Sequence, residues 1–337
     1  MGNAMVDVFA EVPEDFCKHF GLHSPVQHVS PEITSAILAA LPENKVITSG
    51  GCAANTAKIA ARLGLPSAFA GAVGNDQYAD YFEKELADAG VILNLARKKS
   101  PTGVFISLRS KIKLLDTSAE PVRRGSPSAE TRPFAGDQAT YIAASPSAAL
   151  EFDAQDIKGK IQERAILYLE GFLLKRKGLL EKILELVNKH NLTLAIDFGT
   201  AEIAKEEALL VKQKASPFWD EKNRRSFFPL ILFLNEREAE VFAGTFNSYW
   251  EDLFSAAIAS VSVIVKRAEK GAAIFSGGNV FRVETKKINA MESTGSGDAF
   301  AAGFLTELLR GGDPRACGES GNAAAALVLN TPGTSRV

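Results

Sequence analysis

The second half of the chain alternates amphipathic helical segments with short apolar segments, and this rhythm constrains the fold more than any other feature. Residues 178–190 place leucine, isoleucine and valine on one helical face, and residues 192–198 follow as a short apolar run. Similar apolar runs lie at residues 165–169, 230–234 and 261–266. Such alternation is typical of α/β proteins with a mostly parallel sheet. We therefore predict an α/β fold in which these runs are central strands.

The predicted strands end at polar residues. Glu170, Asp197 and Asn235 lie at the ends of three of them, and Lys266 ends the fourth. Open parallel sheets usually bind their ligands at the carboxyl ends of their strands. We therefore expect the functional site at these four residues and in the turn that follows Lys266.

Two segments do not follow the helix–strand rhythm, namely about residues 8–48 and about residues 103–141. The second combines an apolar stretch at residues 102–108 with a polar segment at residues 121–133. Segments of this kind, attached to an α/β body, predict a small β-sheet lid that excludes water from a transfer reaction. We expect residues 1–337 to form one domain that includes this lid.

Composition excludes several classes of partner. The 38 basic and 40 acidic residues give a net charge of -2 without a block of like charge, so neither nucleic acid nor a membrane surface is an expected partner. The three cysteines show no C-x-x-C pair, which is typical of a reducing compartment. Without a signal-peptide pattern or a membrane-length apolar run, the predicted location is cytoplasmic.

The segment at residues 292–300 combines glycines with a carboxylate directly before an apolar run. Gly295, Ser296 and Gly297 therefore lie at a predicted helix start, where free backbone N–H groups and the helix dipole attract an anion. Asp298 follows in the first turn, where it can accept a hydroxyl proton. The segment predicts an anion hole beside a catalytic base for phosphate transfer.

Two other phosphate-binding motifs do not fit this segment, whereas a simple helix cap does. It lacks the G-x-x-x-x-G-K-[ST] pattern of a P-loop, and Phe300 replaces the third glycine of the dinucleotide fingerprint. A helix N-cap with a solvated Asp298 explains the segment equally well when it is considered alone. The segment alone therefore fits both a catalytic base and a helix cap.

Several further motifs occur along the chain in a fixed order. Residues 2–7 (Gly-Asn-Ala-Met-Val-Asp), 50–55 (Gly-Gly-Cys-Ala-Ala-Asn), 71–76, 235–238 and 292–300 together resemble the ribokinase-like carbohydrate kinases, the PfkB family, over nearly the whole chain. The resemblance implies a three-layer α/β/α sandwich with a mostly parallel central sheet and a small β-sheet lid. It also implies transfer of phosphate from ATP, with Mg²⁺, to a hydroxyl group. Monomers and homodimers both occur among such kinases, so either is expected here.

The resemblance assigns roles to individual residues, with Asp298 as catalytic base. Acceptor binding falls to Asn3, Asp7, Gly50, Gly51, Asn55, Glu170 and Asp298. The ATP-binding half is expected at about residues 192–337, with contacts from Asp197, Asn235, Lys266, Ala268, Gly271, Gly295, Gly297 and Asn322. Asn235 and Glu238 are expected to organise Mg²⁺, largely through water.

Several residues depart from the family pattern. Glu292 replaces the usual aspartate, Ser296 the usual alanine, and Ala268 a common glycine of the nucleotide turn. Glu292 and Thr294 lie where many relatives bind a monovalent cation, which leaves activation by K⁺ open. Met1 lies almost at the first motif, so the first strand is expected to be short or to lack residues.

The acceptor is less constrained than the reaction. Residues 12–16, 21–23 and 168–174 resemble the adenosine kinase branch, so adenosine is the first substrate predicted. A plain sugar of the ribose, fructose or 2-keto-3-deoxygluconate type is the alternative. From another enzyme class, a nicotinamide-dependent dehydrogenase is a weaker alternative, because this chain has no G-x-G-x-x-G motif near its first strand. A non-catalytic nucleotide- or sugar-binding homologue is a further alternative, against which the intact Asp298 argues.

Overall fold

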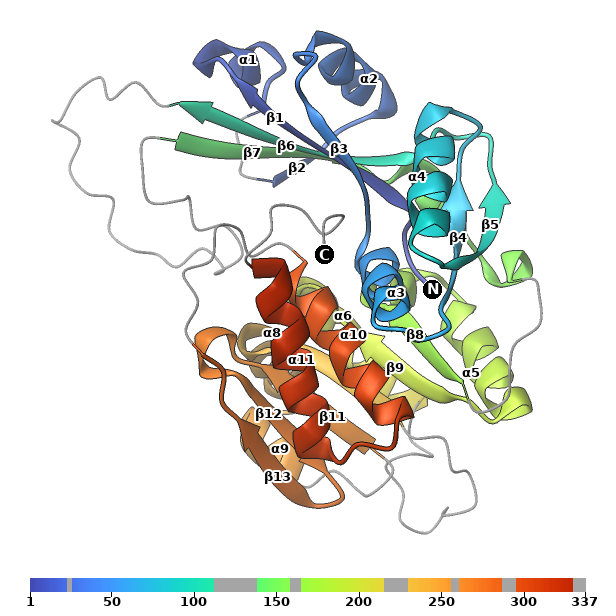
Figure 1. The fold of residues 1–337 in the computed structure, drawn as a ribbon, viewed down its shortest axis with the longest axis vertical. Coiled ribbons are helices and arrows are strands. Elements are labelled where there is room, and N and C mark those ends of the chain that lie inside the picture. Colours follow the sequence, from blue (N-terminus) through green and yellow to red (C-terminus); the bar gives the residue numbers. More distant parts are fainter. Residues whose placement is uncertain are drawn as a thin grey trace, which may run out of the picture.

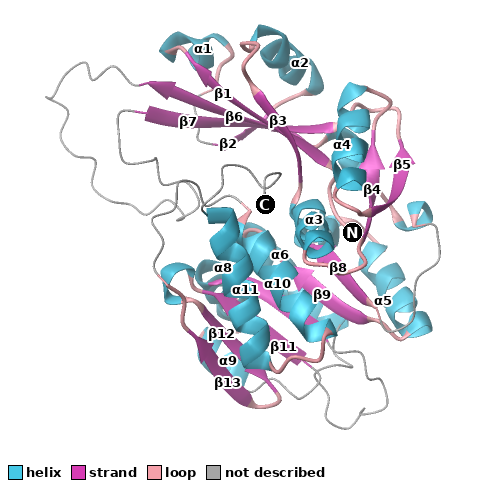
Figure 2. Ribbon diagram, in the orientation of Figure 1, coloured by secondary structure: helices cyan, strands magenta, loops and turns pink. Residues whose placement is uncertain are grey.

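The computed structural model describes residues 1–22, 26–111, 138–157, 165–214, 230–255, 261–286 and 295–329. Within them the chain forms a six-stranded sheet, a five-stranded sheet and a separate pair of strands. The five-stranded sheet lies above the six-stranded one in Figure 1, and Figure 2 separates the strands from the helices that cover them.

The six-stranded sheet contains all four strands predicted from the apolar runs. In spatial order it consists of β13 (Asn279–Val283), β12 (Ala272–Ser276), β11 (Val261–Lys266), β10 (Leu230–Asn235), β9 (Thr193–Asp197) and β8 (Ile166–Glu170). Strands β8 to β11 run parallel, and β12 and β13 add an antiparallel edge. The predicted mostly parallel sheet is confirmed.

Helices cover both faces of this sheet. One face holds α5 (Leu179–His190), α6 (Ala201–Lys214), α8 (Glu236–Gly244) and α9 (Trp250–Ser255), and the other holds α10 (Ser296–Leu309) and α11 (Pro314–Leu329). Strand residues alternate between the two layers: Leu232 packs in the cluster of Ile183 and Phe242, whereas Phe233 packs with Phe304. Because both faces are buried at the centre of the sheet, β10 is apolar from Leu230 to Leu234. The predicted three-layer α/β/α sandwich is confirmed.

A short parallel pair of strands lies beside β8. It consists of β4 (Ala68–Val73) and β5 (Ile92–Arg97), which are joined by α4 (Gln77–Asp88). Met1 and Gly2 lie between β4 and β8: the amino group of Met1 donates to the Tyr168 carbonyl (2.6 Å), and the Gly2 N–H donates to the Ala70 carbonyl (3.2 Å). The first two residues of the chain therefore connect the β4–β5 pair to the six-stranded sheet at β8.

The five-stranded sheet draws its strands from distant parts of the chain. Its order is β2 (Val26–His28), β7 (Gln138–Ser145), β6 (Gly103–Lys111), β1 (Met5–Val12) and β3 (Val46–Gly50), with α1 (Glu14–His19) and α2 (Pro31–Ala40) between strands in sequence. Val6, Val8, Ile106 and Leu108 are fully buried in its core together with Ile37 of α2. Residues 112–137, within the predicted lid, lie outside the described residues.

Helix α3 (Cys52–Arg62) lies between the two sheets (Figure 1). Gly51, which precedes it, has φ of 95°, and a side chain there would collide with the Asn3 carbonyl oxygen. Ile59 of α3 packs against Ala299 and Ala302 of α10. The β3–α3 turn is therefore fixed against the start of β1, and α3 is fixed against α10.

Four short 3₁₀ helices complete the described secondary structure: η2 (Ser147–Glu151), η3 (Ala154–Asp156), η4 (Gly171–Lys175) and η6 (Ala268–Lys270). Across the described ranges, every helix is too short or too polar to cross a membrane.

Candidate active site

The predicted site residues at the strand ends meet at one edge of the six-stranded sheet. Glu170 on β8 is aligned with Asp197 on β9, and Asn235 on β10 is aligned with Lys266 on β11. Parallel strands bring their carboxyl ends to the same edge, which is why residues up to 96 positions apart lie together here. This edge forms the floor of the candidate site.

The start of α10 lies against this floor. Gly295 caps the helix with a left-handed backbone at φ of 79°, and Asp298 occupies the first turn. A Cβ added at Gly297 would lie 3.4 Å from the Lys266 ammonium. Backbone N–H groups of the first turn and a lysine cation therefore occur together, a combination that suits a phosphate group.

Asp298 is held by two residues of α3. The Asn55 side-chain amide donates to Asp298 Oδ2 (2.9 Å). The Thr56 hydroxyl donates to the Cys52 carbonyl oxygen (2.9 Å) and shares this proton with the Asp298 carbonyl oxygen (3.4 Å). Desolvation raises the pKa of Asp298 from 3.8 to about 7, with a further rise from Asp197, while Asn55 and Lys266 oppose the shift. A carboxylate with a pKa near neutrality has the properties of a general base.

Lys266 is anchored by the end of the neighbouring strand. Its ammonium donates to Asp197 Oδ2 (2.8 Å), and the Tyr168 hydroxyl donates to the same oxygen (3.1 Å). Burial opposes the charged form of Lys266, but Asp197, Glu238 and Asp298 outweigh it and raise the pKa of the lysine. Lys266 therefore stays a cation at the start of α10.

Glu170 bonds to backbone groups. Its Oε2 accepts hydrogen bonds from the N–H groups of Asn3 (3.2 Å) and Ala53 (3.4 Å), so it compensates the positive end of α3. Desolvation raises its pKa from 4.5 to about 7, the two N–H groups lower it, and the charge of Asp298 adds to the rise. Glu170 thus joins the start of the chain, at Asn3, to the start of α3, at Ala53.

The other predicted acceptor residues surround the β3–α3 turn. Asp7 on β1 is aligned with Thr48 on β3, and its carboxyl group lies so close to Gly50 that a side chain there would overlap it. The side-chain oxygen Oδ1 of Asn3 accepts a hydrogen bond from Arg176 Nη2 (2.9 Å). Asn3, Asp7, Gly50 and the neighbouring Gly51 therefore lie together at the β3–α3 turn, where the Asn3 N–H also bonds to Glu170.

Asn235 and Glu238 form a reciprocal cap at the start of α8. The Asn235 side chain accepts from the Glu238 N–H (2.8 Å), Glu238 Oε2 accepts from the Asn235 N–H (3.0 Å), and the Asn235 amide donates to Glu238 Oε1 (2.7 Å). Glu238 is buried, and its charge contributes to the raised pKa of Lys266. The N-x-x-E pattern has a structural role at this strand end, beside the lysine.

The donor set is compatible with Mg²⁺ that is held mainly by substrate phosphates and water. Among the described residues no group of three or more His, Cys, Asp or Glu side chains converges as a metal cage. Mg²⁺ commonly uses only one or two protein carboxylates and keeps several waters. Glu238 and Asp298 supply carboxylates at the edges of the site. The proposed cation residues Glu292 and Thr294 lie outside the described residues.

The turn after β11 carries the predicted nucleotide contacts. Ala268 adopts φ of 50° and Gly271 φ of 79°, and a side chain at Gly271 would collide with the Val283 carbonyl oxygen. Asn322, on α11, is half-buried and donates to the Glu284 carbonyl (3.2 Å). The turn and Asn322 thus both contact the residues at the end of β13.

Three neighbours of the site were not predicted from the sequence. Tyr168 bonds to Asp197, Thr56 bonds to the Asp298 backbone, and Cys52 begins α3, where burial and then Asp298 raise the pKa of its thiol. Tyr168 lies two residues before Glu170, and this two-residue spacing along a strand was an available signal. Only the path of α3 across α10 reveals the other two.

Comparisons with known proteins agree with this geometry. The model of the pfkB family carbohydrate kinases matches residues 26–112 and 134–337. The chain is 26% identical over 302 residues to 5-dehydro-2-deoxygluconokinase from Shouchella clausii, covering 85% of this chain and 82% of that protein. A local match to a nucleoside kinase from Methanothermobacter thermautotrophicus is 33% identical over 72 residues, or 21% of this chain and 23% of that protein.

A solved structure matches almost the entire fold. The crystal structure of adenosine kinase from Sinorhizobium meliloti superposes with a TM-score of 0.74 at 21% identity, covering 99% of this chain and 93% of that chain. At this level of identity the likeness establishes the shared fold.

Proposed function

The chain belongs to the pfkB family of carbohydrate kinases and is a carbohydrate or nucleoside kinase; on this premise we propose that it phosphorylates a hydroxymethyl group of a nucleoside, with adenosine as the first candidate. ATP is the proposed phosphate donor and Mg²⁺ the proposed metal ion. The observation that carries the proposal is the position of Asp298 in the first turn of α10, beside Lys266 and held by Asn55.

The proposed reaction is a direct transfer. The acceptor hydroxyl gives its proton to the Asp298 carboxylate while its oxygen bonds to the γ-phosphorus, and the bond from that phosphorus to the β–γ bridging oxygen breaks to release ADP. The N–H groups at the start of α10 and the Lys266 ammonium stabilise the negative charge on the transferred group. Bound Mg²⁺ supplies further charge neutralisation on the phosphates.

The proposed acceptor position lies between the two sheets. Asp7 and Asn3 offer polar atoms that suit the hydroxyl groups of a ribose, and Asn55 links this region to the base. The five-stranded sheet is the proposed lid, which excludes water so that phosphate passes to the acceptor.

Two observations bear on the choice of acceptor. The fold of an adenosine kinase and a local likeness to a nucleoside kinase support a nucleoside. The longer likeness to 5-dehydro-2-deoxygluconokinase favours a plain sugar or sugar acid as the second candidate. Both candidates use the same base and anion hole.

The test is acceptor-dependent release of ADP by the purified protein with MgATP. The panel contains adenosine, guanosine, inosine, ribose, fructose, 2-keto-3-deoxygluconate and 5-dehydro-2-deoxygluconate, each with the wild-type protein and Asp298→Asn. We expect release with adenosine and a loss of about 100-fold or more in the variant, because a positioned base contributes at least that factor. ADP release with the sugars alone would favour the second candidate. If no compound of the panel stimulated ADP release, the proposed kinase function would be wrong.

A further inference from the structure

A lysine without a predicted role is fully buried next to the candidate site. Lys58 lies on α3, one turn after Asn55, and its side chain has 0% exposure. Lysine is almost never fully buried unless it is paired, because removing an ammonium group from water costs free energy. Burial accordingly lowers the pKa of Lys58. Its location therefore requires compensating contacts.

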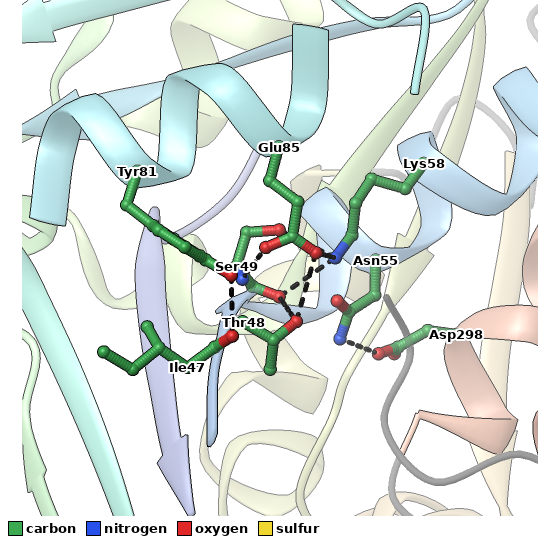
Figure 3. Close-up of polar contacts among 8 residues, drawn as sticks. All are labelled: Ile47, Thr48, Ser49, Asn55, Lys58, Tyr81, Glu85 and Asp298. Atoms are coloured by element: carbon green, nitrogen blue, oxygen red, sulfur yellow. Dashed lines mark hydrogen bonds and ion pairs between the residues drawn. The ribbon is translucent and has the colours of Figure 1, made fainter. Parts of the chain in front are cut away.

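These contacts join three elements of the fold. The Lys58 ammonium donates to the Ser49 carbonyl oxygen (3.0 Å) and to the Ser49 hydroxyl (2.7 Å), both on β3, and lies 3.4 Å from Glu85 Oε1 on α4. Figure 3 shows the ammonium between these groups. All three N–H bonds of the ammonium have an acceptor, so α3, β3 and α4 meet at this one cation.

Glu85 completes the network from the other side. Its Oε2 accepts from the Ser49 N–H (2.5 Å), and its Oε1 accepts from the Thr48 hydroxyl (3.2 Å). The Tyr81 hydroxyl, one turn earlier on α4, donates to the Ile47 carbonyl (2.7 Å; Figure 3). The last residues of β3 are thus held by side chains from two helices.

The position of this network gives it a link to the chemistry. Ser49 directly precedes Gly50 and Gly51, the turn that lies against Asp7 and Asn3. The negative charge of Asp7 acts on Lys58 and favours its charged form. Asn55, on the same helix, bonds to Asp298. The Lys58 cation therefore fixes the β3–α3 turn. This turn lies between Asp7, which is proposed to bind the acceptor, and Asn55, which bonds to the proposed base.

We propose that Lys58 is a positioning residue for the acceptor: by clamping the β3–α3 turn, it keeps Asp7 and Asn55 at the separation that acceptor binding requires. The proposal rests on the kinase function proposed above. Lys58 itself does not contact the reacting groups, and its influence passes through Ser49 and the turn.

A purely structural role makes different predictions. If Lys58 only balanced the charge of Glu85, its removal would lower stability through an unpaired carboxylate, and neutralising Glu85 would repair the damage. If Lys58 positions the acceptor, neutralising Glu85 would restore stability but not the affinity for the acceptor. The Ser49 contacts and the positive charge near Asp7 would still be missing.

The experiment compares Lys58→Met, the double variant Lys58→Met/Glu85→Gln and the wild-type protein. Methionine has a similar length and fills the apolar space without the charge. Lys84→Met is the matched control, because Lys84 also lies on a helix of this region but is 75% exposed and pairs with Asp88 one turn further on. For each protein, the melting temperature and the separate KM values for adenosine and ATP are measured.

We expect the KM for adenosine to rise at least tenfold in both Lys58 variants, with the KM for ATP within twofold of the wild-type value. We expect the double variant to regain most of the melting temperature that Lys58→Met loses, and Lys84→Met to match the wild type. A wild-type KM for adenosine in the double variant would overturn the positioning role while leaving the kinase assignment intact. Absence of acceptor-dependent ADP release from the wild-type protein would instead overturn the proposed function, and this inference with it.

Discussion

The side-chain amide of Asn55 donates a 2.9 Å hydrogen bond to the carboxylate of Asp298, although 243 positions separate the two residues. This bond joins the helix after the first glycine motif to the helix after the second. Asn55 was expected to contact the acceptor, and in this structure it also orients the proposed base.

The pH dependence of the reaction is expected to follow Asp298. Because the pKa of this carboxyl is raised to about 7, it is protonated and inactive as a base below that pH. We expect kcat/KM for adenosine to fall about tenfold per pH unit below the pKa. Since the Asn55 bond lowers this pKa, Asn55→Ala should move the acidic limb to higher pH. An unchanged limb in Asn55→Ala would contradict the link between the two residues.

The same carboxyl is expected to cost stability. The folded protein binds the Asp298 proton more tightly than the unfolded chain, since the pKa rises from 3.8 to about 7 on folding. Stability is therefore lost as pH rises through this window, and the loss is complete above it. Asp298→Asn should raise the free energy of unfolding more at pH 8 than at pH 5, as measured by urea denaturation. An equal change at both pH values would rule out this explanation.

Lys266 is expected to act on the phosphate. Lys266→Met should lower kcat by about 100-fold or more, because the cation beside Gly297 no longer stabilises the transferred charge. Lys182→Met is the control, since Lys182 lies on α5, on the opposite face of the sheet from α10, with a side chain that is 50% exposed. Circular dichroism checks that both variants are folded. A folded Lys266→Met protein with a kcat within threefold of the wild type would remove the lysine from the mechanism.

The turn after β11 offers a test of backbone strain. Ala268 has φ of 50°, a conformation that costs a residue with a side chain about 1–2 kcal/mol. Glycine avoids this cost but gains freedom in the unfolded chain worth about 0.4–1 kcal/mol. We therefore expect Ala268→Gly to raise the free energy of unfolding by up to about 1.6 kcal/mol.

Gly271 in the same turn is the contrasting position. Alanine there would add a side chain against the Val283 carbonyl oxygen at φ of 79°, so Gly271→Ala should destabilise the protein by more than about 1 kcal/mol. Urea denaturation of both variants measures the two effects. Destabilisation by Ala268→Gly would show that the alanine is not strained.

The sequence was sufficient to predict the parallel sheet and the edge at which the site lies. Hydrophobic periodicity is a local property, and the strands ending at Glu170, Asp197, Asn235 and Lys266 were each recognisable within a few residues. Parallel pairing then brings the ends together without further information. The start of α10 was predictable for the same reason, because its glycines directly precede an apolar helix.

The contacts between distant elements were not predictable in this way. The Lys58–Glu85 pair joins residues 27 positions apart. Whether these two side chains meet depends on where β3 ends relative to α4. Read locally, Lys58 is one polar residue on a short helix, and nothing in its neighbours indicates burial. The bond between Asn55 and Asp298 likewise depends on α3 packing against α10. Such information is contained in tertiary packing, which one sequence does not reveal.

The contact between Asp7 and Gly50 has a thermodynamic consequence. Asp7 belongs to β1 of the five-stranded sheet, and Gly50 begins the turn into α3, so any hinge movement at this turn also shifts the surroundings of the carboxylate. Linkage requires reciprocity: if movement of the sheet changes the affinity of Asp7 for an acceptor by some factor, the acceptor changes the equilibrium of that movement by the same factor. On the proposal that Asp7 binds an acceptor hydroxyl, an acceptor without that hydroxyl would therefore both bind more weakly and shift the position of the sheet less.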